Sequence, residues 1–219
     1  MSDRTPYNRI HKITMDPLGL EGILRVPTKV SGIVLFAHGS GSSRHSPRNK
    51  LVAEALHKVG IATLLFDLLT EKEAQDRANI FDIPLLGERL LDATGWIKRH
   101  PDTATLPVGY FGASTGAAAT LVAAASGAWE IAAIVSRGGR PDLAGQALTQ
   151  VKAPTLLIVG EKDTQVLELN RLALGKLRCT KGLVVVPGAT HLFEELGALE
   201  QVVHLARDWL VTHLVYTKI

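Results

Sequence analysis

Three residues in this chain are of the types that together perform nucleophilic acyl transfer: Ser114, Asp163 and His191. Ser114 is the centre of a Gly-x-Ser-x-Gly pattern over residues 112–116, and the other two follow apolar runs nearer the C-terminus. A serine hydroxyl becomes a strong nucleophile when a base takes its proton, and the unperturbed pKa of histidine, ~6.5, suits that exchange. A carboxylate can orient the imidazole and stabilise its cationic form. The three side chains therefore predict a catalytic triad, provided that the fold brings them together.

Each of these residues also has a purely structural interpretation. Ser114 could cap a Gly- and Ala-rich helix, and Asp163 could cap the helix that follows it. Glu161 competes with Asp163 as the carboxylate after the same apolar run, and His191 is one of eight histidines. The catalytic interpretation is favoured because all three residues come directly after predicted strands.

The apolar pattern predicts the elements that carry these residues. Short continuous apolar runs are typical of strands covered on both faces, and apolar residues at helical spacing predict the helices between them. The alternation predicts a mostly parallel eight-stranded sheet with helices on both faces, whose reactive residues lie at the carboxyl ends of the strands. The polar segment 70–82 has no clear period. We expect strands at residues 10–15, 20–26, 32–37, 61–68, 108–111, 131–136, 155–159 and 183–186, and helices at 47–59, 84–98, 115–125, 143–150, 166–177 and 195–214.

A glycine-rich loop over residues 38–43 follows the predicted strand 32–37. Such a loop can bring a backbone N–H close to a substrate carbonyl. We expect one oxyanion donor from the N–H of Ser40 or Gly41 and the other from the N–H of Thr115. A phosphate-binding loop is the alternative, but the segment lacks both G-x-G-x-x-G and G-x-x-x-x-G-K-[ST].

Four arginines lie near two of these strand ends: Arg44, Arg48, Arg137 and Arg140. The guanidinium group binds carboxylate or phosphate through two parallel hydrogen bonds. One hypothesis is therefore that one or more of them selects an anionic substrate. The alternative is that they form structural ion pairs with acids such as Asp67 or Asp142.

The bulk composition bounds the class of protein. The length of 219 residues, with 46% hydrophobic and 21% charged residues, fits a single globular domain over residues 1–219. The net charge of +3 comes without a long basic run, so we expect no nucleic-acid partner. One cysteine permits no internal disulfide. Residues 1–15 are polar and contain no apolar run of signal-peptide length, and no stretch of the sequence approaches the ~18 apolar residues of a membrane span. We expect a soluble cytoplasmic protein with a small-molecule substrate, no membrane partner, no metal and no cofactor; the oligomeric state stays open.

On the loop 38–41, the elbow pattern 112–116 and the chain order of Ser114, Asp163 and His191, the sequence resembles the α/β-hydrolase superfamily, and within it the dienelactone-hydrolase-like branch. Residues 42–49 and 136–142 look like a subgroup found alone or fused to phosphoribosyltransferase-like domains, although no segment here resembles such a domain. The resemblance implies an α/β-hydrolase fold and hydrolysis of an ester or related acyl bond without a cofactor. The chain has no insertion long enough for a large lid, so we expect a rather open site.

One departure from that branch concerns the nucleophile. True dienelactone hydrolases carry a cysteine at the elbow, whereas this chain has Ser114, and its one cysteine, Cys179, lies elsewhere. The resemblance therefore does not carry dienelactone over as a substrate. Two other functions remain open: a non-catalytic binding or regulatory module on the same fold, and acyl transfer to an acceptor other than water.

Overall fold

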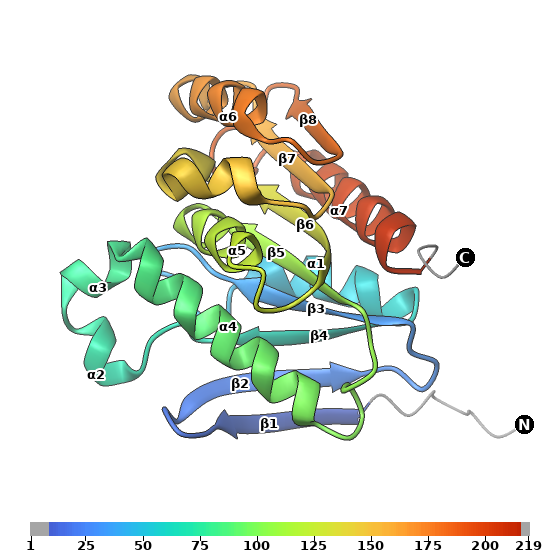
Figure 1. The fold of residues 1–219 in the computed structure, drawn as a ribbon. Helices are drawn as coiled ribbons and strands as arrows, with labels where there is room; N and C mark the ends of the chain where they lie inside the picture. The colour runs from blue at the N-terminus through green and yellow to red at the C-terminus, as the bar shows by residue number, and fades with distance from the viewer. Residues whose placement is uncertain (1–8, 216–219) are drawn as a thin grey trace, which may run out of the picture.

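Eight strands form one twisted sheet in the computed structural model, which describes residues 9–215 (Figure 1). The single domain expected over residues 1–219 thus includes ends, 1–8 and 216–219, that lie outside the described residues. The strand order is β1-β2-β4-β3-β5-β6-β7-β8; β2 is antiparallel to both β1 and β4, and all other neighbours are parallel. The bounds are β1 Arg9–Met15, β2 Leu20–Val26, β3 Gly32–Ala37, β4 Ile61–Phe66, β5 Val108–Ala113, β6 Ile131–Arg137, β7 Thr155–Gly160 and β8 Lys181–Val186.

Helices cover both faces of this sheet. On one face α1 (Pro47–Lys58) packs against α7 (Ala198–Val215), and on the other α4 (Ile83–Arg99), α5 (Thr115–Ala125), the 3₁₀ helix η1 (Pro141–Gln150) and α6 (Thr164–Lys176) lie side by side (Figure 1). All residues of β3, β4, β5 and β7 are buried, because these strands have a helical layer on either side. The predicted fold class is confirmed. No helix among the described residues has the length and apolar character to cross a bilayer.

The strand order creates a crevice where the site is expected. From β3 the chain passes to β4 on one side, and later strands are added through β5 on the other. Loops that leave two such neighbouring strands diverge, so their carboxyl ends border an open crevice. The glycine-rich loop leaves β3 and the elbow leaves β5, so these two segments face each other across this point.

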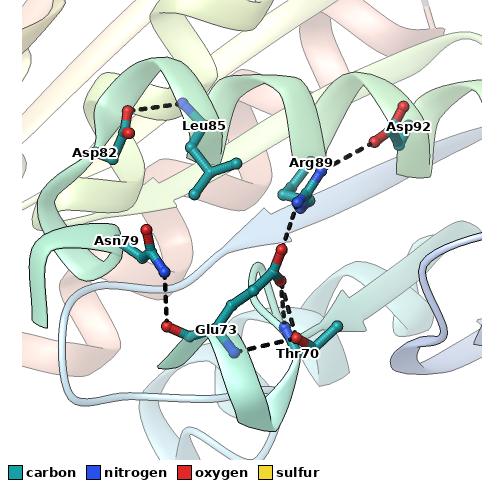
Figure 2. Close-up of polar contacts among 7 residues, drawn as sticks. All are labelled: Thr70, Glu73, Asn79, Asp82, Leu85, Arg89 and Asp92. Carbon is teal, nitrogen blue, oxygen red and sulfur yellow. Dashed lines mark hydrogen bonds and ion pairs between the residues drawn. The ribbon is translucent and has the colours of Figure 1, made fainter. Parts of the chain in front are cut away.

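The segment 70–82, for which no element was predicted, contains two short helices, α2 (Glu71–Ala74) and α3 (Arg77–Phe81). Neither helix buries a residue. Polar contacts hold them instead: Thr70 and Glu73 form a capping box, the Glu73 carboxylate accepts from Arg89 Nη2 of α4 at 2.5 Å, and Asn79 Nδ2 donates to the Glu73 carbonyl at 2.9 Å (Figure 2). The short length and the absence of an apolar face explain why the pattern did not predict them.

Several predicted boundaries on the C-terminal side shift by one to three residues: β8 begins at Lys181, α6 spans Thr164–Lys176, and two further helices differ as follows. The helix expected at 143–150 is a 3₁₀ helix that begins at Pro141 and breaks at Gly145, whose φ is 56°. The last helix starts at Ala198 rather than at residue 195, because Glu195 belongs to the preceding loop, where its carboxylate accepts from the Thr190 N–H at 3.0 Å.

Candidate active site

Ser114 occupies a strained turn between β5 and α5. Its φ of 51° and ψ of −121° lie in a region where residues other than glycine rarely occur. Backbone strain of this kind concentrates at functional sites. The pattern's two glycines are required sterically. A Cβ on Gly112 would lie 2.4 Å from Ala117 Cα, and one on Gly116 would lie 2.2 Å from the Ala37 carbonyl oxygen. The sequence therefore folds here into a tight elbow that presents the serine at the end of the sheet.

Ser114 occupies the N-cap position, immediately before the first residue of α5, but its hydroxyl makes no capping hydrogen bond. The structural interpretation of this serine, a simple helix cap, therefore fails. The side chain is half-buried, and its backbone N–H donates to the Arg137 carbonyl of β6 at 3.3 Å. The hydroxyl thus lies at the carboxyl end of β5 without a hydrogen bond to the backbone of α5.

Asp163 and His191 are joined by a hydrogen bond. The Asp163 Oδ2 to His191 Nδ1 distance is 2.6 Å, and Asp163, like Ser114, does not cap the helix that it precedes. Because a carboxylate accepts, Nδ1 carries the proton and Nε2 of the neutral ring has its lone pair free. Glu161, the competing carboxylate, instead accepts from the Gly188 N–H at 2.7 Å and braces the loop that leads to His191.

Ser114 and His191 lie at the same edge of the sheet, on either side of the end of β6. The backbone carbonyl of Arg137 accepts from the Ser114 N–H. A Cβ on the next residue, Gly138, would lie 3.5 Å from His191 Cε1. Phe193, just after His191, is the other non-glycine residue with a positive φ in the described part of the chain. Asp163 and His191 are therefore in contact after β7 and β8, and Ser114 lies at the neighbouring end of β5. No hydrogen bond joins the Ser114 hydroxyl to His191 among the described residues, so the complete triad stays a prediction.

The loop after β3 lies directly against the elbow. A Cβ on Gly39 would come within 2.8 Å of Ser114 Cβ, and the Ser40 N–H donates to Thr115 Oγ1 at 3.0 Å. The two segments expected to supply oxyanion donors are thus joined by a hydrogen bond. In this arrangement the Ser40 N–H already has an acceptor, so the choice between Ser40 and Gly41 stays open.

His38 has a positioning role that the sequence pattern did not reveal. Its Nδ1 donates to the Gly39 carbonyl at 3.0 Å, and its Nε2 accepts from the Leu68 N–H at 3.1 Å. Burial lowers the pKa of His38, which keeps the ring neutral and able to bridge both groups. The ring therefore ties the loop to the segment after β4. Its place immediately after a buried strand was the available signal.

A cavity of about 550 Å³ opens beside this loop. Sites for small molecules are typically of this size. Ser40, Gly41 and Thr115 border it at the elbow, and Glu21, Arg44 and Asp67 add charged groups. The apolar part of the wall comes from the segment after β4, from α2, α3 and α4: Leu68, Leu69, Ala74, Ile80 and Leu86.

The structure separates the four candidate arginines into two kinds. Arg44 forms ion pairs with Asp67 and Glu21, and Arg140 forms a two-pronged pair with Asp142 at 2.9 and 2.8 Å. Arg48 reaches only the exposed Glu194, at 3.7 Å, and the Arg137 guanidinium forms no ion pair within the described residues. Arg44 and Arg140 thus adopt the structural pairing, whereas Arg48 has only a long pair with an exposed carboxylate and Arg137 has no ion pair among the described residues.

Comparison with known proteins gives this site its context. Residues 20–199 match the model of the dienelactone hydrolase family. Two Mycobacterium tuberculosis proteins, provisionally named phosphoribosyl transferases, are 62% identical over 203 residues; the match covers 93% of this chain but only 46% of theirs. The chain therefore spans about half the length of these curated relatives.

Solved structures agree with the family match. The crystal structure of a dienelactone hydrolase from Anabaena variabilis is 52% identical, covers 96% of this chain and 100% of its own, and superposes with a TM-score of 0.90. Est1E from Butyrivibrio proteoclasticus, at 17% identity and a TM-score of 0.77 over 93% of this chain and 98% of its own, shares the fold. The family match over residues 20–199, together with the relative that is 52% identical, establishes that the chain belongs to the dienelactone hydrolase family.

Proposed function

We propose that this chain is a serine hydrolase that cleaves an ester or related acyl bond of a small substrate through an acyl-enzyme. The observation that carries the proposal is the state of Ser114: a strained backbone that presents a hydroxyl which caps no helix. Strain at such a position persists only where the surrounding structure enforces it, which fits a nucleophile elbow. The family supports an enzyme of the hydrolase type.

In the proposed mechanism, Ser114 Oγ attacks the substrate carbonyl while His191 Nε2 takes the hydroxyl proton. Asp163, bonded to Nδ1, stabilises the imidazolium that forms. His191 then returns the proton to the leaving alcohol. In the second half, His191 takes a proton from water, the water oxygen attacks the acyl carbon, and the proton passes to Ser114 Oγ as the acid is released.

The oxyanion of the tetrahedral intermediate needs two donors. The Thr115 N–H at the start of α5 is one, since this end of the helix carries partial positive charge. The Ser40 N–H is the second candidate if it releases or shares its bond to Thr115 Oγ1, and the Gly41 N–H is the alternative. Small substrates are favoured by the 550 Å³ cavity that borders these groups.

The names of the relatives do not transfer further than this. Phosphoribosyl transfer is not proposed for this chain, because the name belongs to proteins of which the chain spans less than half. Dienelactone is not proposed as the substrate, because Ser114 stands where that reaction's cysteine is expected. The cytoplasmic location stays a prediction from the single cysteine and the apolar pattern.

A fluorophosphonate probe tests the proposal directly. We expect covalent labelling of the wild-type protein and none of Ser114→Ala, together with hydrolysis of p-nitrophenyl esters that Ser114→Ala loses. Folded wild-type protein that neither reacts with the probe nor cleaves any ester would contradict the proposal and favour a binding module. Product analysis with added alcohols or amines distinguishes hydrolysis from acyl transfer.

A further inference from the structure

Two guanidinium groups with buried, unpartnered Nε–H groups lie near the start of α1. Arg137 is only 7% exposed, and its one side-chain hydrogen bond in the described structure is a long one, 3.5 Å, from Nη2 to Asn49 Oδ1 in the first turn of α1. The Nε–H groups of Arg137 and Arg48 are both buried and have no acceptor among the described residues. Buried polar groups in native proteins nearly always have partners. An acceptor from outside the chain would satisfy these two N–H groups.

The positive charge of Arg137 and Arg48 is also only weakly compensated. Glu194, which pairs with Arg48 at 3.7 Å, has a side chain that is 69% exposed, so solvent screens the pair. Burial, and secondarily the charge of Arg48, lowers the pKa of Arg137 to about 10. That value still leaves the group protonated at neutral pH. A buried cation without a counter-charge is costly, and an anion bound there would relieve the cost.

The helix adds to this positive field. The first turn of α1 contains no acidic residue and carries Arg48 itself, although the N-terminus of a helix favours anions over cations. In the first turn, Pro47 has no N–H, the Asn49 N–H donates to Ser46 Oγ and the Lys50 N–H donates to the Ser46 carbonyl. The helix therefore contributes its positive end, and the arginine forks, which bind carboxylate and phosphate in proteins, would supply the hydrogen bonds. The side chain of Arg48 is 28% exposed, so the cluster opens to solvent on this side.

The cluster adjoins the candidate active site. The carbonyl of Arg137 accepts the Ser114 N–H, the next residue lies against His191, and Glu194 is three residues after His191. We propose that Arg137 and Arg48, at the positive end of α1, form an anion-binding subsite that takes a carboxylate or phosphate group of the substrate. The assignment to a substrate group rests on the proposed hydrolase function; the binding of an anion does not.

Charge discrimination between matched esters tests the substrate role. Mono-p-nitrophenyl esters of succinate, glutarate and adipate are each compared with the uncharged ester of the same acyl length. We expect wild type to prefer at least one anionic ester, measured as a ratio of kcat/KM values. Arg137→Met and Arg48→Gln should each reduce that ratio about 10- to 100-fold, the usual effect of losing a hydrogen bond to a charged group. Arg140→Gln, which removes an arginine already paired with Asp142, should leave the ratio unchanged.

Calorimetric titration with inorganic phosphate tests the subsite without any turnover. We expect binding to wild type and to Arg140→Gln, and weaker or no binding to Arg137→Met and Arg48→Gln. If phosphate binds in this pattern while the ester ratio does not change, the anion is a free ion rather than a substrate group. If no ester is cleaved and the serine probe does not react, the proposed hydrolase function fails, and the titration still decides on the subsite.

Unchanged ester ratios together with absent or unaltered phosphate binding would overturn the proposal. Under that outcome, a lower Tm for Arg137→Met would assign the residue a structural role through Asn49. Because Arg137 is buried, its variant could fail to fold; Arg48→Gln, at a partly exposed position, then carries both measurements on its own.

Discussion

The helices on the N-terminal side of this protein begin differently from the two that begin at the candidate active site. At the start of α1, α2, α3 and α4, a side-chain oxygen accepts a hydrogen bond from an N–H of the helix's own first turn: Ser46, Thr70, Asp76 and Asp82. At the start of α5 and α6, Ser114 and Asp163 are of equally suitable types but make no such bond. A capping residue contributes about 1 kcal/mol, so the last two positions forgo stability that the others gain. The difference separates side chains that hold a helix from side chains that make no bond to the helix they precede, as the proposed catalytic roles require.

The largest expected effect comes from Ser114→Ala. We expect kcat/KM for p-nitrophenyl esters to fall by at least about 10⁴-fold, as for loss of other triad serines. The free energy of unfolding should change by less than about 0.5 kcal/mol, because no cap is lost. Denaturant titration and steady-state kinetics measure the two quantities. A fall in stability of the size of a lost cap would contradict the comparison.

Asp163→Asn should produce the next largest effect. The amide can donate to His191 Nδ1 and so favours the wrong tautomer, with an expected loss of about 10³- to 10⁴-fold in kcat. Glu161→Gln is the matched control at the same strand end, since Glu161 contacts the loop backbone and not the imidazole. Equal losses for the two variants would show that Asp163 has no special role.

Asp82→Ala should show the opposite profile. Its carboxylate accepts from the Leu85 N–H at 3.0 Å at the start of α4 (Figure 2), so we expect a loss of about 1 kcal/mol in the free energy of unfolding. Ester hydrolysis per folded molecule should stay at the wild-type rate. An activity loss without a stability loss at this position would place it with Ser114 and Asp163 instead.

Thr70→Val should have the smallest global effect. It removes the hydroxyl of the capping box that starts α2, but α2 and α3 bury no residue, so their opening is independent of the core. We expect amide exchange in α2 to accelerate about fivefold, the equivalent of ~1 kcal/mol, while Tm stays unchanged. A large drop in Tm would mean that this segment is coupled to the core after all.

Strongly patterned elements could be predicted from the sequence, and the fold class with them. Strand β3 is a continuous apolar run whose residues are all buried, and its predicted bounds match those of the structure. Strands β5 and β6 run further than predicted, to Ala113 and Arg137, because their last residues pair in the sheet but are not apolar enough in sequence to extend a run. Helices α2 and α3 lack an apolar face, and polar contacts to α4 replace it.

The candidate site could be predicted only in part. Chain order pointed to Ser114, Asp163 and His191, and the structure joins the last two by a hydrogen bond, while their catalytic role stays a prediction. Sequence could not separate Asp163 from Glu161, because two carboxylates two residues apart after one strand differ only in which way the turn directs them. For the arginines, the sequence analysis named Asp67 and Asp142 as possible partners, and Arg44 and Arg140 do pair with them. It could not show that Arg137 has no carboxylate partner, because its neighbour Asn49 comes from a distant segment.

The polar attachment of α2 and α3 has a consequence for the variation of this scaffold. These helices form one wall of the cavity, yet the sheet and its helical layers take no buried side chain from them. A replacement of this segment by a longer or differently shaped one would therefore remodel the compartment while sparing the interior on which folding depends. The compartment could then diversify among descendants of one ancestor without a change at Ser114, Asp163 or His191, none of which lines this cavity.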